Sequence, residues 1–168
     1  VNFPAFEQAL KGFSRYASGQ DRLLVLIDYT KPSTEKRFYI LDLLQKKLLL
    51  STYVAHGRGS GDNYAVAFSN RPGSYQSSLG FFRTGDTYMG KNGYSLFLDG
   101  LEKGINDKAR ERAIVVHGAN YADPAVLKGQ QRLGRSLGCP ALPPDLSKQV
   151  IDTIKGGVLL YIYGLNKA

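Results

Sequence analysis

Two short segments of this sequence combine residue types that can carry out nucleophilic chemistry. Cys139, the only cysteine, stands between Gly138 and Pro140 in RSLGCPAL, and His117 precedes Gly118 at the end of the apolar run AIVVHG. A thiol attacks as its thiolate, so it needs a base or a positive charge nearby. The amide N–H groups around a Gly-Cys step can point together at a developing oxyanion. These residues predict a cysteine nucleophile with His117 as its base.

Each of these residues also has a purely structural interpretation. A lone cysteine is often a small buried apolar residue, although a turn bounded by glycine and proline is an unusual place for one. A histidine at the end of a strand often serves the fold alone. His56 also ends an apolar run and is also followed by glycine, in YVAHGRGSG, so it competes with His117 for the role of base. Spacing alone leaves both alternatives open.

The neighbouring basic residues suggest how a substrate is held. Arg132 and Arg135 lie just before Cys139, where they are candidates to hold a substrate carboxylate or to favour the thiolate. His56 is a further candidate contact for the substrate. Two histidines and one cysteine without close spacing predict no metal site, and no phosphate-cradling or other cofactor motif is present, so we expect no cofactor.

The segment from Gly57 to Ser78 is rich in glycine and serine and carries Tyr64, Phe68 and Tyr75. Connections of this length inside a compact domain are usually functional. We therefore expect either a lid over the active site, with Tyr75 as a candidate substrate contact, or a plain loop.

The elements that must position these residues are mostly strands. Nineteen glycines, seven prolines and 11% aromatic residues favour strands and turns. We expect one domain over residues 1–168, with a short amphipathic helix at about residues 4–17. Strands are predicted over RLLVLIDYT, RFYILDLL, KLLLSTYVAHG, LGFFRTGDTY, GYSLFLDG, ERAIVVHGANY and VLLYIYGL, and helices over DPAVLKGQQRL and PPDLSKQVIDTIKGG. Strands and helices do not alternate regularly, which excludes a doubly wound parallel fold and leaves a mainly β domain with a few short helices, of the α+β class.

Charge and length limit the remaining possibilities. The net charge of +8 is compatible with nucleic acid, with an anionic cell-wall polymer or with an ordinary solvated surface. The basic residues are interleaved with acidic ones and form no long run, so we expect no nucleic-acid partner. No apolar run approaches the roughly 18 residues of a membrane-spanning helix. The chain begins at Val1 without a signal peptide, which we expect of a mature or trimmed form.

VVHGA and RSLGCPAL together resemble the murein L,D-transpeptidase catalytic domain family, in which a His-Gly strand end is followed by a Ser-x-Gly-Cys turn. The likeness to the branch found in Gram-negative bacteria extends over YVAHGRGSGDNYAVAFSNRPGSYQSSLGFF, GYSLFLDGLEKG and ARERAIVVHGANY, roughly from Phe6 to Tyr163. The resemblance implies a mixed β-sandwich-like domain that lies in the cell envelope, in the periplasm, and acts on peptidoglycan stem peptides.

The resemblance also implies a role for individual residues. Cys139 is then the acylated nucleophile and His117 its base, with the Gly118 carbonyl orienting the imidazole. The N–H groups of Gly138 and Cys139 form the oxyanion hole, and Ser136 supports the turn. A carbapenem is expected to acylate the same thiol.

Two positions depart from the commoner family pattern. Leu137 stands where that pattern has a second histidine, and Ala141 where it has an arginine or asparagine. The sequence therefore predicts a cysteine-dependent L,D-transpeptidase acting on stem tetrapeptides. The alternatives are an L,D-carboxypeptidase that uses the same nucleophile and a non-catalytic module that binds the cell wall.

Overall fold

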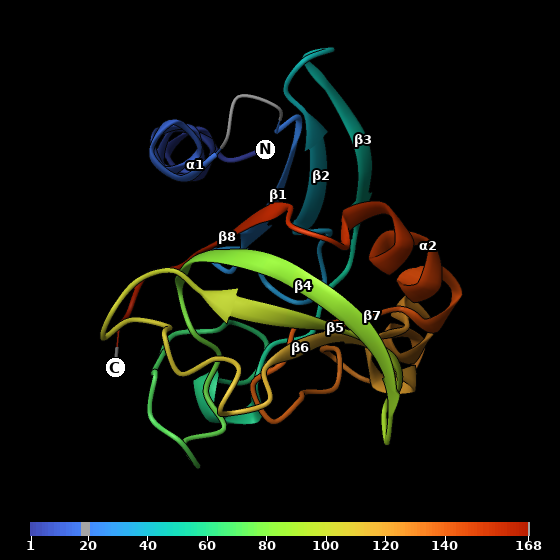
Figure 1. The fold of residues 1–168 in the computed structure, drawn as a ribbon. Helices are drawn as coiled ribbons and strands as arrows, with labels where there is room; N and C mark the ends of the chain where they lie inside the picture. The colour runs from blue at the N-terminus through green and yellow to red at the C-terminus, as the bar shows by residue number, and fades with distance from the viewer. Residues whose placement is uncertain (18–20, 168) are drawn as a thin grey trace.

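A single mixed sheet of eight strands organises the computed structural model, which describes residues 1–17 and 21–167 (Figure 1). Its strands lie in the spatial order β3-β2-β1-β8-β4-β5-β6-β7. Their bounds are β1 Leu23–Asp28, β2 Phe38–Asp42, β3 Lys47–Thr52, β4 Gly80–Gly90, β5 Gly93–Gly100, β6 Val115–Gly118, β7 Ala141–Leu142 and β8 Leu159–Tyr163. The helices are α1, Phe3–Tyr16, and α2, Pro144–Ile154, with short 3₁₀ turns at Arg58–Ser60, Asn120–Ala122 and Pro124–Lys128.

The sheet joins strands from both ends of the chain. β2 pairs antiparallel with β1 and β3, and the parallel pair β1–β8 connects this hairpin region to β4. β4, β5 and β6 continue antiparallel, and β7 is parallel to β6 at the far edge. β2 and β3 run across the direction of β4 and β5, so the sheet is strongly twisted (Figure 1). The predicted mainly β architecture with short helices is confirmed.

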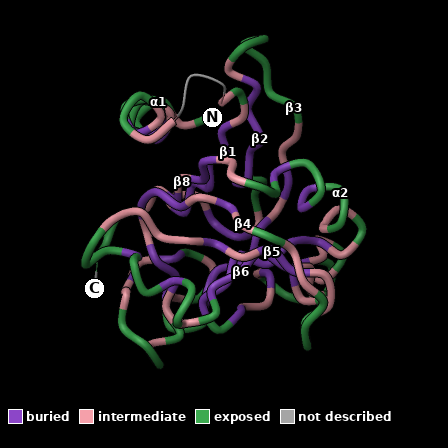
Figure 2. Tube along the Cα trace, viewed as in Figure 1, coloured by how far each residue is buried: buried purple, intermediate pink, exposed green. Residues whose placement is uncertain are grey.

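The two α-helices cover different parts of the sheet. α1 begins at a cap where the Asn2 side chain accepts the Ala5 N–H, and it buries Ala5, Ala9 and Gly12. α2 packs on β6 and buries Val150, Ile151 and Ile154. Figure 2 shows buried chain running through the centre of the sheet, with exposed chain on the outer side of α1 and at the β2–β3 tip. The helix expected at about residues 4–17 and the helix within PPDLSKQVIDTIKGG are both present.

Two predicted elements are shorter than expected. The strand predicted over ERAIVVHGANY is limited to Val115–Gly118, because the chain before it forms hydrogen-bonded turns that end at Ala113, where φ is 56°. The helix predicted over DPAVLKGQQRL is the 3₁₀ turn Pro124–Lys128, capped by the Asp123 side chain. Neither change moves the two segments that carry Cys139 and His117 out of the sheet edge.

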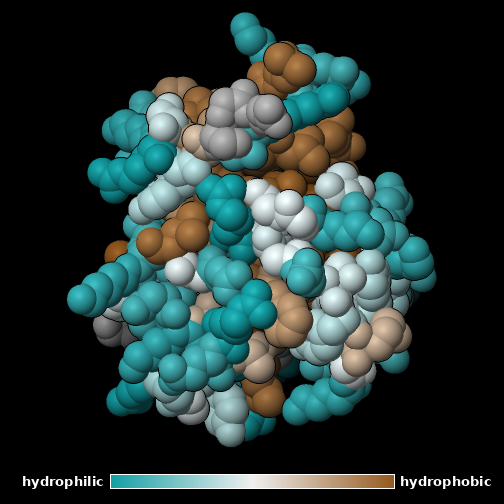
Figure 3. Space-filling model, viewed as in Figure 1, coloured by the Kyte–Doolittle hydropathy of each residue, from teal (hydrophilic) through white to brown (hydrophobic). Residues whose placement is uncertain are grey.

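The surface is largely hydrophilic in the lower half of the view, and the clearest apolar patch lies at the upper strands (Figure 3). Leu44, Leu48 and Leu49, at the β2–β3 tip, are exposed. No helix in the described part of the chain has both the length and the apolar character of a membrane span.

Candidate functional site

The turn that carries Cys139 is braced by the side chain of Ser136. The Ser136 hydroxyl donates to the Cys139 carbonyl at 2.6 Å and accepts the Gly138 N–H at 3.1 Å. Gly138 has a φ of 129°, and a Cβ at this position would lie 2.9 Å from the Ile114 side chain. Only glycine fits this position without strain, so Ser136 and Gly138 together fix how Cys139 enters β7.

The sulfur of Cys139 lies against the chain just before and within β6. It accepts the Val115 N–H at 3.4 Å, and its S–H donates to the Ala113 carbonyl, also at 3.4 Å. Cys139 is only 9% exposed, and burial raises the pKa of its thiol, while the Val115 N–H and the positive charge of Arg112 act in the opposite direction. The resting residue is therefore a neutral thiol that needs a base to become a nucleophile.

His117 has the arrangement that a base requires. Its Nδ1–H donates to the Gly118 carbonyl at 2.9 Å, which leaves Nε2 as the nitrogen with the free lone pair. The side chain is 3% exposed, and burial lowers the pKa of the imidazole, partly offset by the bond to Gly118. Position 118 has little room for a side chain, because a Cβ there would lie 2.5 Å from the Ser147 hydroxyl of α2. The helix and the carbonyl thus hold a neutral ring in one tautomer.

The sheet brings His117 and Cys139 to neighbouring segments without joining their side chains. His117 on β6 is paired with Ala141 on the parallel strand β7, and Ala141 follows Cys139 by two residues. In the described part of the chain, no hydrogen bond links the thiol to the imidazole, since the thiol donates to Ala113 instead. The expected contact between sulfur and imidazole is therefore still a prediction for the substrate-bound state, in which catalytic hydrogen bonds often tighten.

His56 has no ring nitrogen free for a substrate. Nδ1 lies 2.9 Å from an Arg37 guanidinium nitrogen, which can only donate, so Nε2 carries the proton and donates to the Gly61 carbonyl at 3.1 Å. His56 is 1% exposed, and burial together with the charge of Arg37 lowers its pKa to about 4. The interpretation of His56 as a substrate contact or rival base is corrected: it is a neutral structural residue.

Arg37 is itself fully buried beneath the site. Its guanidinium donates to the Val54 and Lys31 carbonyls and lies 4.7 Å from the centre of the Tyr29 ring. Burial lowers its pKa to about 10. The His56 carbonyl accepts the Ser136 N–H at 2.9 Å. Arg37 and His56 together therefore support the turn that carries Cys139.

The two arginines expected near the thiol are engaged elsewhere. Arg135 pairs with Asp62 at 3.1 Å, and Arg132 donates to the Leu133 carbonyl at 2.9 Å. The cation with the larger effect on Cys139 is Arg112, which sequence reasoning missed because ARERA has the composition of a solvated surface. Its Nη2 atom lies 3.5 Å from the place that a Cβ on Gly138 would occupy.

Arg112 also fastens the long segment between Gly57 and Ser78. Its guanidinium donates four hydrogen bonds, to the carbonyls of Ser69 and Gln76 and to the hydroxyls of Ser74 and Ser78. The Gly57 N–H donates to the Ser77 hydroxyl at 2.9 Å. In this structure the segment is therefore held beside the Cys139 turn, and its movement as a lid stays a prediction.

The predicted oxyanion hole is also changed in this state. The Gly138 N–H is already bonded to the Ser136 hydroxyl, whereas the Cys139 N–H makes no hydrogen bond within the described residues. The Cys139 amide is therefore the free donor of the expected pair. Leu137, in place of the usual histidine, is 54% exposed beside it.

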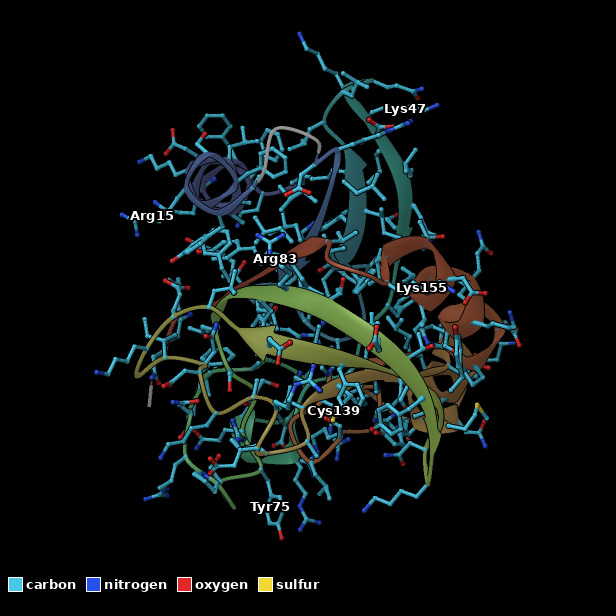
Figure 4. All side chains as sticks on the ribbon, in the orientation of Figure 1. Arg15, Lys47, Tyr75, Arg83, Cys139 and Lys155 are labelled. Carbon is cyan, nitrogen blue, oxygen red and sulfur yellow. The ribbon has the colours of Figure 1, made fainter. Side chains whose placement is uncertain are left out.

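Tyr75 lies at the outer rim of the same end of the molecule. Figure 4 shows Cys139 inside the lower half and Tyr75 farther out, while Lys47 marks the opposite tip. Tyr75 is 42% exposed and therefore accessible to a ligand, and its role as a substrate contact stays a prediction.

One cavity of the structure lies away from this site. It has a volume of about 740 Å³, lies between α1 and strands β4 and β8, and is lined by none of the predicted site residues. Neither Cys139 nor His117 faces it, so it does not compete with the Cys139 turn as the catalytic site. Across residues 1–17 and 21–167, no group of three histidine, cysteine or carboxylate side chains is placed to bind a metal ion.

Three comparisons with known proteins bear on this arrangement. The chain is similar in fold to an L,D-transpeptidase from Mycobacterium smegmatis (TM-score 0.51, 13% identity, covering 85% of this chain and 59% of that one). It is also similar in fold to the helical cell shape determining protein Pgp2 from Campylobacter jejuni (TM-score 0.57, 16% identity, covering 88% of this chain and 50% of that one). A third similar structure is Bd1075 from Bdellovibrio bacteriovorus (TM-score 0.54, 14% identity, covering 86% of this chain and 49% of that one). The chain thus spans half to three fifths of these structures, and a search of the curated proteins gave no match. A family model for the L,D-transpeptidase catalytic domain matches residues 1–163, and the chain therefore belongs to that family.

Proposed function

We propose that this domain is a cysteine-dependent L,D-transpeptidase that acts on the tetrapeptide stems of peptidoglycan through a thioester on Cys139. The observation that carries the proposal is the state of His117: its Nδ1–H is committed to the Gly118 carbonyl, and its free Nε2 lies on the strand next to the braced Cys139 turn. The family acts on peptidoglycan, which supports the choice of substrate. We place the protein in the cell envelope, in the periplasm, on the same ground.

The first half-reaction forms the thioester. His117 Nε2 takes the proton from the Cys139 thiol, and the thiolate attacks the carbonyl carbon at the L-centre of diaminopimelate. The free Cys139 N–H is the donor for the resulting oxyanion. As the tetrahedral intermediate collapses, the C–N bond to the terminal D-alanine breaks, and the imidazolium returns the proton to the departing amine.

The second half-reaction releases the acyl group. An amine of a second stem peptide attacks the thioester, His117 accepts its proton, and the thiol is restored when the C–S bond breaks. Water as the acceptor gives the carboxypeptidase reaction instead. We favour transfer because the segment between Gly57 and Ser78, which Arg112 holds beside the Cys139 turn, can limit the access of water to the thioester.

Two experiments test the proposal. Intact-mass spectrometry after incubation with a carbapenem should show one covalent adduct per chain, absent from Cys139→Ala; imipenem is a suitable probe, since a related L,D-transpeptidase has been solved in complex with it. The absence of an adduct after long incubation would favour a non-catalytic module.

Incubation with purified disaccharide tetrapeptides separates transfer from hydrolysis. Cross-linked dimers, resolved by chromatography and mass, are the expected product. Tripeptides alone at high acceptor concentration would identify a carboxypeptidase instead.

A further inference from the structure

Tyr75 is held in a backbone conformation that its side chain disfavours. Its φ is 57°, in the left-handed region that residues other than glycine, asparagine and aspartate seldom occupy. The Tyr75 carbonyl accepts the Gly59 N–H at 2.8 Å, which fixes the residue in this conformation. The strain turns an aromatic ring outward to 42% exposure, and such strain concentrates at functional positions.

The exposed ring holds the guanidinium of Arg58. The Arg58 Cζ atom lies 4.5 Å from the centre of the Tyr75 ring, a stacking geometry that orients the guanidinium plane. Arg58 is itself exposed. Among the residues described, no carboxylate, carbonyl or hydroxyl accepts a hydrogen bond from its side chain.

Most other arginines of this chain differ from Arg58 in this respect. Several have an aspartate partner, and one buried and one half-buried arginine donate to backbone carbonyls. The arginines paired with aspartate are Arg22, Arg83, Arg110 and Arg135; Arg37 is the buried one and Arg112 the half-buried one. Arg58 therefore presents an oriented, unpaired fork of N–H donors to solvent, which is the geometry that recognises a carboxylate.

This pair is fastened directly to the nucleophile turn. The Arg58 N–H donates to the Ser136 carbonyl at 2.8 Å. Gly57 lies between the two structures: a Cβ on it would be 2.5 Å from the Tyr75 carbonyl oxygen and 2.8 Å from the Gly138 Cα. The Arg58–Tyr75 pair is thus separated from the Cys139 turn by one glycine.

We propose that Arg58, oriented by the strained ring of Tyr75, binds a free carboxylate of the stem peptide and so determines the specificity of the site. The proposal rests on the proposed function, since it deepens the substrate class of that site. A stem tetrapeptide offers two internal carboxylates of the same chemistry, one on its D-glutamate and one at the D-centre of diaminopimelate. Amidation of either one removes the charge and leaves the length of the peptide unchanged.

The test measures binding separately from turnover. Tetrapeptide affinity is measured by calorimetry on Cys139→Ala, alone and combined with Arg58→Ala, Arg58→Lys or Tyr75→Gly. Arg58→Ala should weaken binding about tenfold or more, as the loss of a charge-assisted hydrogen bond predicts. Arg58→Lys should recover only part of this, because an ammonium lacks the planar fork. Arg71→Ala is the matched control, an exposed arginine of the same segment, and should leave binding unchanged.

The amidated peptides identify which carboxylate is bound. Each amidated peptide is measured on Cys139→Ala with Arg58 intact and on the double variant with Arg58→Ala. The recognised carboxylate is the one whose amidation weakens binding when Arg58 is present and has no effect when Arg58 is replaced. Tyr75→Gly should lower affinity while leaving thermal stability unchanged or raised, since glycine accepts the left-handed φ. A purely structural role for Tyr75 would not separate these two readouts.

The outcomes for this inference and for the proposed function are distinguishable. Equal affinity for both amidated peptides and for the free acid, with no effect of Arg58→Ala, overturns the inference even if the enzyme cross-links tetrapeptides. Conversely, Arg58-dependent carboxylate binding with no thioester or carbapenem adduct supports the inference and overturns the proposed catalysis.

Discussion

The two histidines of this protein occupy the same local sequence, an apolar run followed by His-Gly, yet their surroundings differ completely. At His56 both ring nitrogens are engaged, one by the Arg37 guanidinium and the other by the Gly61 carbonyl. At His117 only Nδ1 is engaged, by the carbonyl of the next residue. Both rings are buried and neutral, so burial alone does not distinguish a structural histidine from a candidate base. The distinction lies in whether Nε2 carries a proton or a lone pair.

The difference teaches that the tautomer of a histidine depends on its hydrogen-bond partners, which can come from a distant segment or from the next residue. Arg37 forces His56 to accept at Nδ1, because a guanidinium can only donate. Within residues 1–17 and 21–167, no guanidinium bonds to His117, and the carbonyl of the next residue holds Nδ1–H and so leaves Nε2 basic. The predictions below test this contrast.

Removal of the nucleophile sets the baseline for the comparison. We expect Cys139→Ala to lower turnover of disaccharide tetrapeptides by about a thousandfold or more, because no other thiol is present to form the thioester. Stability should change little, since the thiol makes only long, weak contacts at 3.4 Å. Rates are measured by chromatography of the products. Activity above about a thousandth of wild type would show that Cys139 is not the nucleophile.

The same substitution at each histidine separates their roles. His117→Gln should lower activity by about 10²- to 10⁴-fold, the usual contribution of a general base. His56→Gln should retain most activity in the folded fraction and instead lower the midpoint of thermal unfolding, because Arg37 loses the partner that fits its geometry. If His56→Gln inactivates a fully folded protein and His117→Gln does not, the assignment is reversed.

Acid should destabilise the fold through His56. Its pKa is about 4 in the folded protein against 6.5 for the unperturbed side chain, so below about pH 6.5 the unfolded chain binds a proton that the folded chain does not. The stability contribution is complete above this pH and is lost as the pH falls toward 4, by about 3 kcal/mol. Chemical denaturation between pH 7 and pH 4 measures it. The slope should diminish in His56→Gln, and an unchanged slope would mean that other groups control acid unfolding.

The fold was more predictable from the sequence than the site. The strands within RFYILDLL and KLLLSTYVAHG and the helix within PPDLSKQVIDTIKGG follow from local patterns of apolar residues and turn residues, and the structure has all three. The role of Arg112 was not visible, because its four acceptors lie 34 to 43 residues away in the sequence. His56 was misjudged for the same reason, since the deciding contact comes from Arg37 on another part of the chain.

The glycines that follow the two histidines provide the last and smallest test. A Cβ at Gly57 would meet the backbone oxygen of Tyr75 at 2.5 Å, and a Cβ at Gly118 would meet the side-chain oxygen of Ser147 at the same distance. A backbone atom cannot move without displacing its segment, whereas a hydroxyl can rotate away. We therefore expect Gly57→Ala to lower the free energy of unfolding by about 2 to 3 kcal/mol and Gly118→Ala by about 1 kcal/mol.

Urea denaturation of both variants measures this difference, and a second substitution locates its origin. Ser147→Gly removes both the hydroxyl and the Cβ that a side chain at Gly118 would meet, the latter at 2.8 Å. The cost of Gly118→Ala should therefore be smaller in a Ser147→Gly background, whereas the cost of Gly57→Ala should be the same in both. Because Ser147 lies on α2, this coupling would show that the helix positions the Gly118 carbonyl and, through it, the imidazole of His117. Additive effects of Gly118→Ala and Ser147→Gly would instead mean that the strand alone holds His117 in its basic tautomer.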